Sequence, residues 1–495
     1  MRRTHVLLVV LLVCMVIPPS GSSVMTRHCK DLFSMPAQGG VLLTGIPYVW
    51  QEINGFCAWA ATSSVMQYHG ADVSLHDLFA LSGIGFSFAY IRYNDTLLIY
   101  PGALYQQIDP ANLACELVGL NYSVYFNADL EGIEQQISFL ESRGIDVGLI
   151  DGESGAFTFM KASIDAGNPV IASIDPIWLP AEDYDFLREN DLSGGGHAIV
   201  IAGYNDTSGK ATILDPGVGS FGDSFGYPVD GRGNYTEISY ANLNLAWSAR
   251  EYISLLIKPN GDAPESVSNQ LGPYIRDYLL GVGDVYAPGS ASAYLWSFGE
   301  KAFRLLSEDM TPEGLSAYLS VFDGIDNERY FKASLLKFIG LGLGSEVTLQ
   351  YLAYRSALQS VSSFFPDTDI ATFLDKADDA LPHLNALSEN RTLIQIGNLS
   401  IHDSLISSTF GGLADAFNSS GDLGAALEAY DEELEQISTH LLGVADSWLA
   451  AGNTLAEIWP NNPLIVYGPI LILGALGVAA VVVTVLYLIR KSDSQ

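Results

Sequence analysis

Four residues have the types and the order needed for chemistry at a carbonyl group: Gln51, Cys57, His197 and Asp215. A thiolate is a strong nucleophile, an imidazole can carry its proton, a carboxylate can orient the imidazole, and a side-chain amide can donate to a developing oxyanion. These residues therefore predict acyl transfer through a thioester. Cys57 would attack, His197 would act as the base, Asp215 would orient His197, and Gln51 would stabilise the oxyanion.

Cys57 stands at the start of a predicted helix, CAWAATSSVMQYHG, directly after an Asn-Gly pair. The unpaired N–H groups and the positive dipole end of a helix N-terminus favour a thiolate. Gln51 lies on the loop that enters this helix, where its amide can approach the N–H of Cys57. The alternative is that Cys57 is an inert core thiol, but the partners available to it favour the nucleophile.

His197 begins the apolar strand-like run HAIVIAGY, and three glycines precede it. Asp215 follows the next strand-like run, ATIL, and the string NDTSG between the two runs predicts a hairpin turn. The hairpin would bring Asp215 beside His197. Asn205 and Asp206, in the turn itself, are the competing candidates for the residue that orients His197.

Other motif-like strings predict no chemistry. GDSFG, around Ser224, matches the nucleophile elbow but lacks the strand before it and the helix after it. GYNDTSGKA has neither the spacing nor the Ser or Thr of a phosphate-binding loop. Because no cluster of His, Cys, Asp and Glu has metal-ligand spacing, we expect neither a metal nor another cofactor.

The elements that must position these residues lie in an α+β domain over residues 35–258, where strand-like runs alternate with helical stretches. A turn-rich polar break follows, and residues 265–460 read as an all-α helical domain or stalk. Within it, residues 423–458 carry apolar positions at alternating steps of four and three, typical of a helix packed along a seam. We favour packing within the same chain, and self-association with a second copy is the alternative.

Both ends of the chain predict a membrane-anchored, exported protein. Residues 1–23 resemble a signal peptide, with two arginines, an apolar run and small residues. Residues 464–489 form an apolar stretch long enough for one transmembrane helix, and the basic tail at 490–495 marks its cytoplasmic side. The bulk of the chain would then lie outside the cytoplasm, where Cys29 and Cys115 could be bridged or reduced.

The composition excludes one class of partner. The chain has 495 residues and a net charge of −33 at pH 7. A field of this sign repels phosphate backbones, so we expect no nucleic-acid partner. The expected partners are a peptide or acylated substrate outside the cytoplasm and the membrane itself.

Three stretches carry a resemblance to papain-like cysteine peptidases: IPYVWQEINGFCAWAATSSVMQYHG, GGGHAIVIAGYND and ATILDPG. They are similar to the glutamine, cysteine, histidine and aspartate blocks of the branch that contains double-glycine leader peptidases. LFALSGIGFSFAYIR and PVIASIDPIWLPAEDYDF resemble more closely the N-terminal domain of butirosin biosynthesis protein H, which moves an acyl group from a carrier protein through a cysteine. The resemblance implies the same four roles for Gln51, Cys57, His197 and Asp215.

The sequence thus predicts a membrane-anchored, extracytoplasmic cysteine hydrolase that cleaves a peptide or amide bond. Transfer of an acyl or peptidyl group is the first alternative, because the same thioester can react with an amine. A surface binding module without catalytic activity is the second.

Overall fold

The computed structural model describes residues 39–460 except 53–54, 94–95, 103–109, 131–132, 143–144, 192, 194, 219–232, 261–265, 283–284, 287–293, 389–392, 397–398 and 403. The chain divides into two compact units. Unit 1 contains the described residues within 1–78, 111–264 and 395–400, and unit 2 contains those within 79–110, 265–394 and 401–495.

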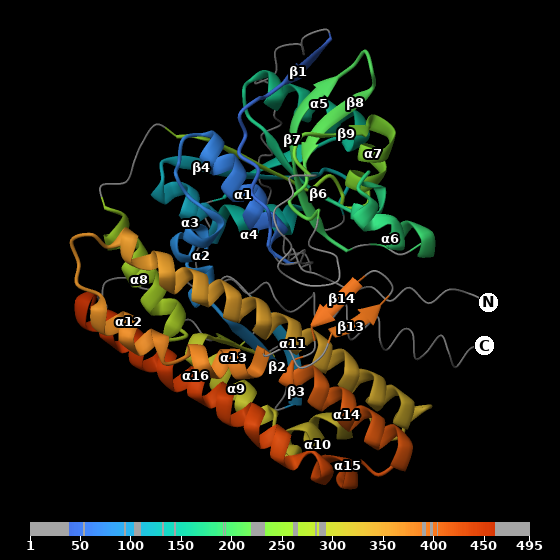
Figure 1. The fold of residues 1–495 in the computed structure, drawn as a ribbon, viewed down its shortest axis with the longest axis vertical. Coiled ribbons are helices and arrows are strands. Elements are labelled where there is room, and N and C mark those ends of the chain that lie inside the picture. The colour runs from blue at the N-terminus through green and yellow to red at the C-terminus, as the bar shows by residue number, and fades with distance from the viewer. Residues whose placement is uncertain are drawn as a thin grey trace. The chain divides into compact units, whose positions relative to one another are not determined.

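Unit 1 is built on an 8-stranded sheet in the order β5-β4-β10-β6-β7-β8-β9, with β1 paired to β7 (Figure 1). All neighbouring strands pair antiparallel except β4 and β5, which are parallel. The strands are β1 (Gly40–Leu42), β4 (Leu120–Asn127), β5 (Asp146–Ile150), β6 (Val170–Ile174), β7 (His197–Asn205), β8 (Lys210–Leu214), β9 (Thr236–Ser239) and β10 (Ser254–Pro259).

Strand β7 is the centre of this sheet. Its first eight residues are all buried, which explains why they form an almost continuous apolar run. The predicted hairpin is confirmed, because β7 pairs antiparallel with β8 and residues 206–209 form the turn between them. On its other side β7 pairs with β6, where Ile174 lies opposite His197. The site histidine therefore stands at the end of a rigid central strand.

Helix α1 packs against β7 and β6, and it begins at Cys57 as predicted. Its buried positions include small residues such as Ala60, Ala61 and Ser64, which allow close approach to the sheet. The remaining helices of unit 1 and its borders are α2 (Leu75–Leu81), α3 (Pro110–Leu117), α4 (Ile133–Ser142), α5 (Gly152–Asp165), η2 (Pro176–Trp178), η3 (Glu182–Tyr184), α6 (Asp185–Asn190) and α7 (Tyr240–Ser248); α1 spans Cys57–Tyr68.

Unit 2 is mainly helical, as the sequence predicts, but it is not all-α. It contains a 4-stranded sheet in the order β11-β12-β2-β3, and β13 pairs with β14 elsewhere in the chain. Its elements and that hairpin are η1 (Ile84–Phe86), β2 (Ala89–Tyr93), β3 (Thr96–Gly102), α8 (Val267–Leu279), β11 (Val285–Tyr286), β12 (Tyr294–Phe298), α9 (Gly299–Asp309), α10 (Pro312–Ser320), α11 (Glu328–Ser360), η5 (Val361–Phe364), α12 (Ala371–Asp378), α13 (Leu381–Ser388), β13 (Leu393–Ile396), β14 (Leu399–His402), α14 (Leu405–Ser420), α15 (Leu423–Ala429) and α16 (Asp431–Ile458).

The four-stranded sheet also changes the predicted domain boundary. Residues 79–110, which the sequence places within one continuous domain over 35–258, belong to unit 2. Their strand β2 pairs with β12, far along the chain. Pairing at such a sequence separation leaves no periodic signal in a local stretch of residues, so the sequence pattern could not reveal it.

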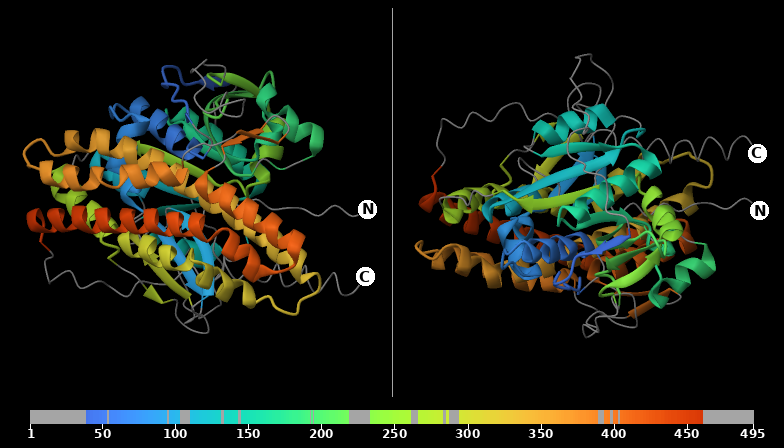
Figure 2. Two further views of the ribbon diagram at one scale, coloured as in Figure 1. Left: turned by 60° about the horizontal axis from the view of Figure 1, so that its bottom comes forward. Right: turned by 90° about the horizontal axis from the view of Figure 1, so that it is seen from above.

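The seam predicted over residues 423–458 is divided between α15 and α16, which meet at Tyr430. Figure 2 shows α16 in red, and it packs against α8, α9, α12 and α13 of the same unit. Its seam residues Leu434, Leu441 and Trp448 are fully buried there. At Gly443 an added Cβ would lie 2.4 Å from the ring of His383, so the glycine permits close packing. The apolar seam of α16 therefore packs against helices of the same chain.

Two predicted segments lie outside the described residues: the signal peptide at 1–23 and the transmembrane helix at 464–489 with its tail at 490–495. In the part of the chain that is described, no helix has both the length and the apolar character needed to cross a membrane. Cys29 also lies outside it, whereas Cys57 and Cys115 lie within it and carry thiols.

Candidate active site

His197 and Asp215 form a buried ion pair at one end of the β7–β8 hairpin. The Nε2 atom of His197 lies 2.7 Å from Oδ1 of Asp215. Both residues are almost completely inaccessible, at 4% and 2% exposure. The predicted contact between His197 and Asp215 is therefore present, and their burial strengthens its electrostatic effect.

The pKa of His197 reflects two opposing influences. Burial lowers it, but the charge and hydrogen bond of Asp215, helped by Cys57, raise it from 6.5 to about 10. The imidazole is thus protonated near neutral pH. Because Nε2 is directed at Asp215, Nδ1 is the ring nitrogen left for the thiol.

Cys57, the first residue of α1, is hydrogen-bonded to His197 and partly exposed. Burial raises the pKa of its thiol, but the hydrogen bond and charge of His197 and the backbone N–H groups of Ala198 and Ala58 outweigh this effect and lower it below 9.0. The residue before the helix, Phe56, has no side-chain acceptor to cap the first turn. The N–H groups of that turn are therefore directed at the sulfur and the space beside it.

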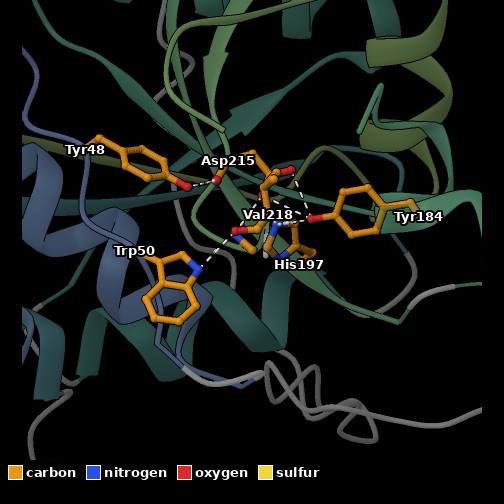
Figure 3. A network of polar contacts seen from close by, with 7 residues as sticks. Tyr48, Trp50, Tyr184, His197, Asp215 and Val218 are labelled. Carbon is orange, nitrogen blue, oxygen red and sulfur yellow. Dashed lines mark hydrogen bonds and ion pairs between the residues drawn. The ribbon is translucent and has the colours of Figure 1, made fainter. Parts of the chain in front are cut away.

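The segment that carries Gln51 is tied to the residues around Asp215 by three hydrogen bonds. Tyr48 Oη donates to the Asp215 carbonyl at 2.8 Å, and Trp50 Nε1 donates to the Val218 carbonyl at 3.0 Å (Figure 3). The N–H of Gln51 donates to the carbonyl of the residue after Asp215 at 3.1 Å. Gln51 is completely buried, and its side-chain donation to an oxyanion stays a prediction.

Tyr184 is a site residue that the sequence did not reveal. Its hydroxyl lies 3.0 Å from Oδ2 and 3.2 Å from Oδ1 of Asp215, and 3.4 Å from Nε2 of His197. Figure 3 shows it approaching this pair from the side opposite Tyr48. With 25 tyrosines in the chain, nothing in its local residue pattern distinguishes Tyr184 from the others.

Two glycines leave room for this arrangement. A Cβ at Gly217 would lie 2.7 Å from Cε1 of His197 and 2.8 Å from the hydroxyl of Tyr184. At Gly233 it would lie 2.0 Å from the carbonyl oxygen of Asp215, which in turn accepts from Tyr48. The N–H of Gly217 also donates to Oδ1 of Asp215 at 2.9 Å. The carboxylate is therefore fixed by donors from several elements.

The competing orienting residues lie at the other end of β7. Asn205 ends the strand and caps the turn by accepting from the N–H groups of Thr207 and Ser208. Asp206 pairs with Lys161 at 2.5 Å. A strand that begins at His197 and ends at Asn205 spans roughly 25 Å, so neither residue can reach the imidazole. Ser224 lies outside the described residues.

The charge of His69 differs from what is usual for a histidine at the C-terminal end of a helix. It occupies the position after α1, where a protonated imidazole would be favoured by the helix dipole. Burial instead lowers the pKa of His69, and its Nε2 is buried without a hydrogen-bond partner. His69 is therefore neutral and plays no part in the ion pair at the other end of α1.

Taken together, Cys57, His197 and Asp215 form a connected thiol–imidazole–carboxylate site. Its charges favour a thiolate–imidazolium pair, which is a nucleophile with its proton donor already in place. In the described residues, no group of three or more His, Cys, Asp and Glu could hold a metal ion.

The comparisons with known proteins agree with this geometry. A family model described as "Peptidase_C39 like family" matches residues 43–243. The matched range contains Gln51, Cys57, His197 and Asp215, and the match supports a papain-like cysteine peptidase domain in this part of the chain. No curated protein matches the chain.

Proposed function

We propose that unit 1 is a cysteine hydrolase that cleaves a peptide or amide bond through a thioester on Cys57. One observation carries the proposal: the buried 2.7 Å contact between His197 and Asp215, whose imidazole is hydrogen-bonded to the thiol of Cys57 at the start of α1. The family match supports a peptidase-type enzyme at a coarser level.

The proposed reaction begins with attack of the Cys57 thiolate on the substrate carbonyl carbon. The carbonyl oxygen becomes an oxyanion, which the Cys57 N–H and the Gln51 side-chain amide would stabilise. His197 then gives its Nδ1 proton to the amine, the C–N bond breaks, and a thioester remains. Neutral His197 next takes a proton from water, whose oxygen attacks the thioester and releases the carboxylic acid and the thiolate.

We also propose that the chain is exported and held in the membrane by residues 464–489, with the site outside the cytoplasm. Support comes from the apolar stretch and the basic residues that follow it. A site on that side of the membrane would act on extracytoplasmic peptides or acylated amines.

Acyl or peptidyl transfer is the second candidate, favoured by the resemblance to butirosin biosynthesis protein H. The two reactions share the thioester and differ in what attacks it, water or an amine. The chemistry of the first step is the same for both.

The test is product analysis with the full-length chain in detergent. The protein is incubated with a peptide library, with and without hydroxylamine, and products are identified by mass spectrometry. Hydrolysis predicts new carboxyl termini that disappear in Cys57→Ala but persist in Cys115→Ala. Products that are predominantly hydroxamates, with little free acid, would favour transfer, and cleavage that survives in Cys57→Ala would refute the proposal.

A further inference from the structure

Tyr184 is completely buried at the end of η3 and faces the ion pair of unit 1. Its ring lies 6.1 Å from that of His197, centroid to centroid, and tilted against it. The tyrosine belongs to the same hydrophobic cluster as Leu179 and Leu187. An apolar wall with one hydroxyl therefore closes the site on the side of Asp215.

The hydroxyl has one proton and two neighbours that could compete for it. Nε2 of His197 is itself a donor to Oδ1 of Asp215, so the Tyr184 proton goes to the carboxylate. Oδ2 of Asp215 receives it at 3.0 Å. The contact of 3.4 Å with Nε2 then places a lone pair of the tyrosine oxygen toward the imidazolium.

We propose that Tyr184 is a positioning residue for the Cys57–His197–Asp215 site. Its hydroxyl holds Oδ2 of Asp215 so that Oδ1 stays directed at His197, and its ring keeps water from this ion pair. The inference rests on the proposed function of Cys57 and adds a hydroxyl that acts through Asp215.

The charges around the hydroxyl keep it in the donor form. Burial raises the pKa of Tyr184 well above its usual value, and the charges of Asp215, Asp183 and Cys57 raise it further. Tyr184 therefore remains protonated wherever the ion pair exists. His197 begins β7, Asp215 directly follows β8, Cys57 begins α1, and Asp183 lies on η3 with Tyr184.

Loss of the Tyr184 hydroxyl should reduce the fraction of Cys57 that is present as thiolate. Without the hydroxyl, Oδ2 of Asp215 loses this donor and the carboxylate is held at Oδ1 by Gly217 and His197. The imidazolium then loses part of its support. Tyr184→Phe should raise the pH midpoint of Cys57 alkylation by about one unit, which is about a tenfold loss of thiolate below the midpoint. Turnover should fall by a similar factor through kcat, since the hydroxyl contacts Asp215 and His197.

The experiment measures the rate at which iodoacetamide modifies Cys57 in the full chain over a pH series, with peptide mapping. Tyr204→Phe is the matched control, because Tyr204 is also buried and donates to a carboxylate, Asp165, at 2.7 Å on the distant part of β7. That variant should keep the wild-type midpoint. An unchanged midpoint in Tyr184→Phe as well would overturn the proposal.

A double-mutant cycle separates positioning from general destabilisation. In an Asp215→Asn background, Tyr184→Phe should move the midpoint little further, because its partner is already altered. Equal shifts in both backgrounds would contradict action through Asp215. If Tyr184→Phe does not fold, the exchange rate of the His197 Nε2–H proton with solvent is measured in the wild-type protein instead. Slow exchange supports an ion pair shielded from water, and rapid exchange refutes the shielding.

These outcomes differ from failure of the proposed function. If wild-type Cys57 reacts no faster than in denatured chain, the activated nucleophile itself is disproved. If wild-type Cys57 is reactive and only the Tyr184 effect is missing, the hydrolase proposal stands and the role of Tyr184 falls.

Discussion

Removal of the Cys57 thiol should change how the stability of unit 1 depends on pH. In the unfolded chain His197 titrates near 6.5 and Cys57 near 9.0. Between these values the unfolded pair holds one proton, on sulfur. At pH values between the lowered pKa of Cys57 and 9.0, the folded pair also holds one proton, but on the imidazole, because the pKa of His197 is raised to about 10.

Equal proton counts mean that the pair adds no slope to the stability curve in this window. The raised pKa of His197 gives stability that is complete below 6.5 and is lost as pH rises toward about 10. The lowered pKa of Cys57 gives stability that is complete above 9.0 and is lost as pH falls. In the wild type these two trends cancel between the lowered pKa of Cys57 and 9.0.

Cys57→Ala leaves only the histidine trend, since Asp215 still supports the imidazolium. The free energy of unfolding should then fall by about 1.4 kcal/mol per pH unit relative to wild type. This relative loss builds up from the lowered pKa of Cys57 to about pH 9.0, where the unfolded thiol also loses its proton. The other titrating groups are the same in the wild type and in Cys57→Ala, so their contributions cancel in the difference between the two free energies of unfolding.

The assay is hydrogen exchange of β7 peptides across a urea series, which reports on the opening of unit 1 alone. Cys115→Ala is the control for the loss of a buried thiol, and its stability should run parallel to that of the wild type. If Cys57→Ala runs parallel to the wild type all the way up to pH 9.0, no thiolate–imidazolium pair exists.

Three further predictions concern catalysis and topology. Asp215→Asn should retain more activity than His197→Ala, because it disturbs the orientation of the base without removing it; the reverse order in kcat would reject the assignment of Asp215. Gln51→Ala should reduce kcat by about 10²–10³ with a smaller effect on KM, and a change confined to KM would argue against an oxyanion role. Protease added outside intact cells should release nearly all of the chain before residues 464–489, whereas protection of the Cys57 peptide would reverse the proposed topology.

The site could be predicted from the sequence where its signals are local. Cys57 follows a turn and begins a helix, and His197 and Asp215 flank a short hairpin. In each case a stretch of consecutive residues determines the placement. The apolar run of β7 likewise indicates a buried central strand, and the first residue of this strand is the site residue His197.

Contacts between distant segments could not be predicted in the same way. Tyr184 reaches Asp215 only because the loop after β6 folds back, and Trp50 meets the Val218 carbonyl across a large sequence separation. In unit 2, strand β2 pairs with β12, which lies far along the chain. Their positions depend on the packed structure, not on any pattern within a local stretch.

The central claim is that Cys57 is an activated nucleophile, and its alkylation rate tests this most directly. The full chain is treated with iodoacetamide near pH 6, and the rate at each cysteine is obtained by peptide mapping. Because the pKa of Cys57 is lowered by His197, Cys57 should react faster than Cys115 and faster than in denatured protein, and this advantage should vanish in His197→Ala. Labelling of Cys57 at the denatured rate, or equally fast labelling in His197→Ala, would contradict the account.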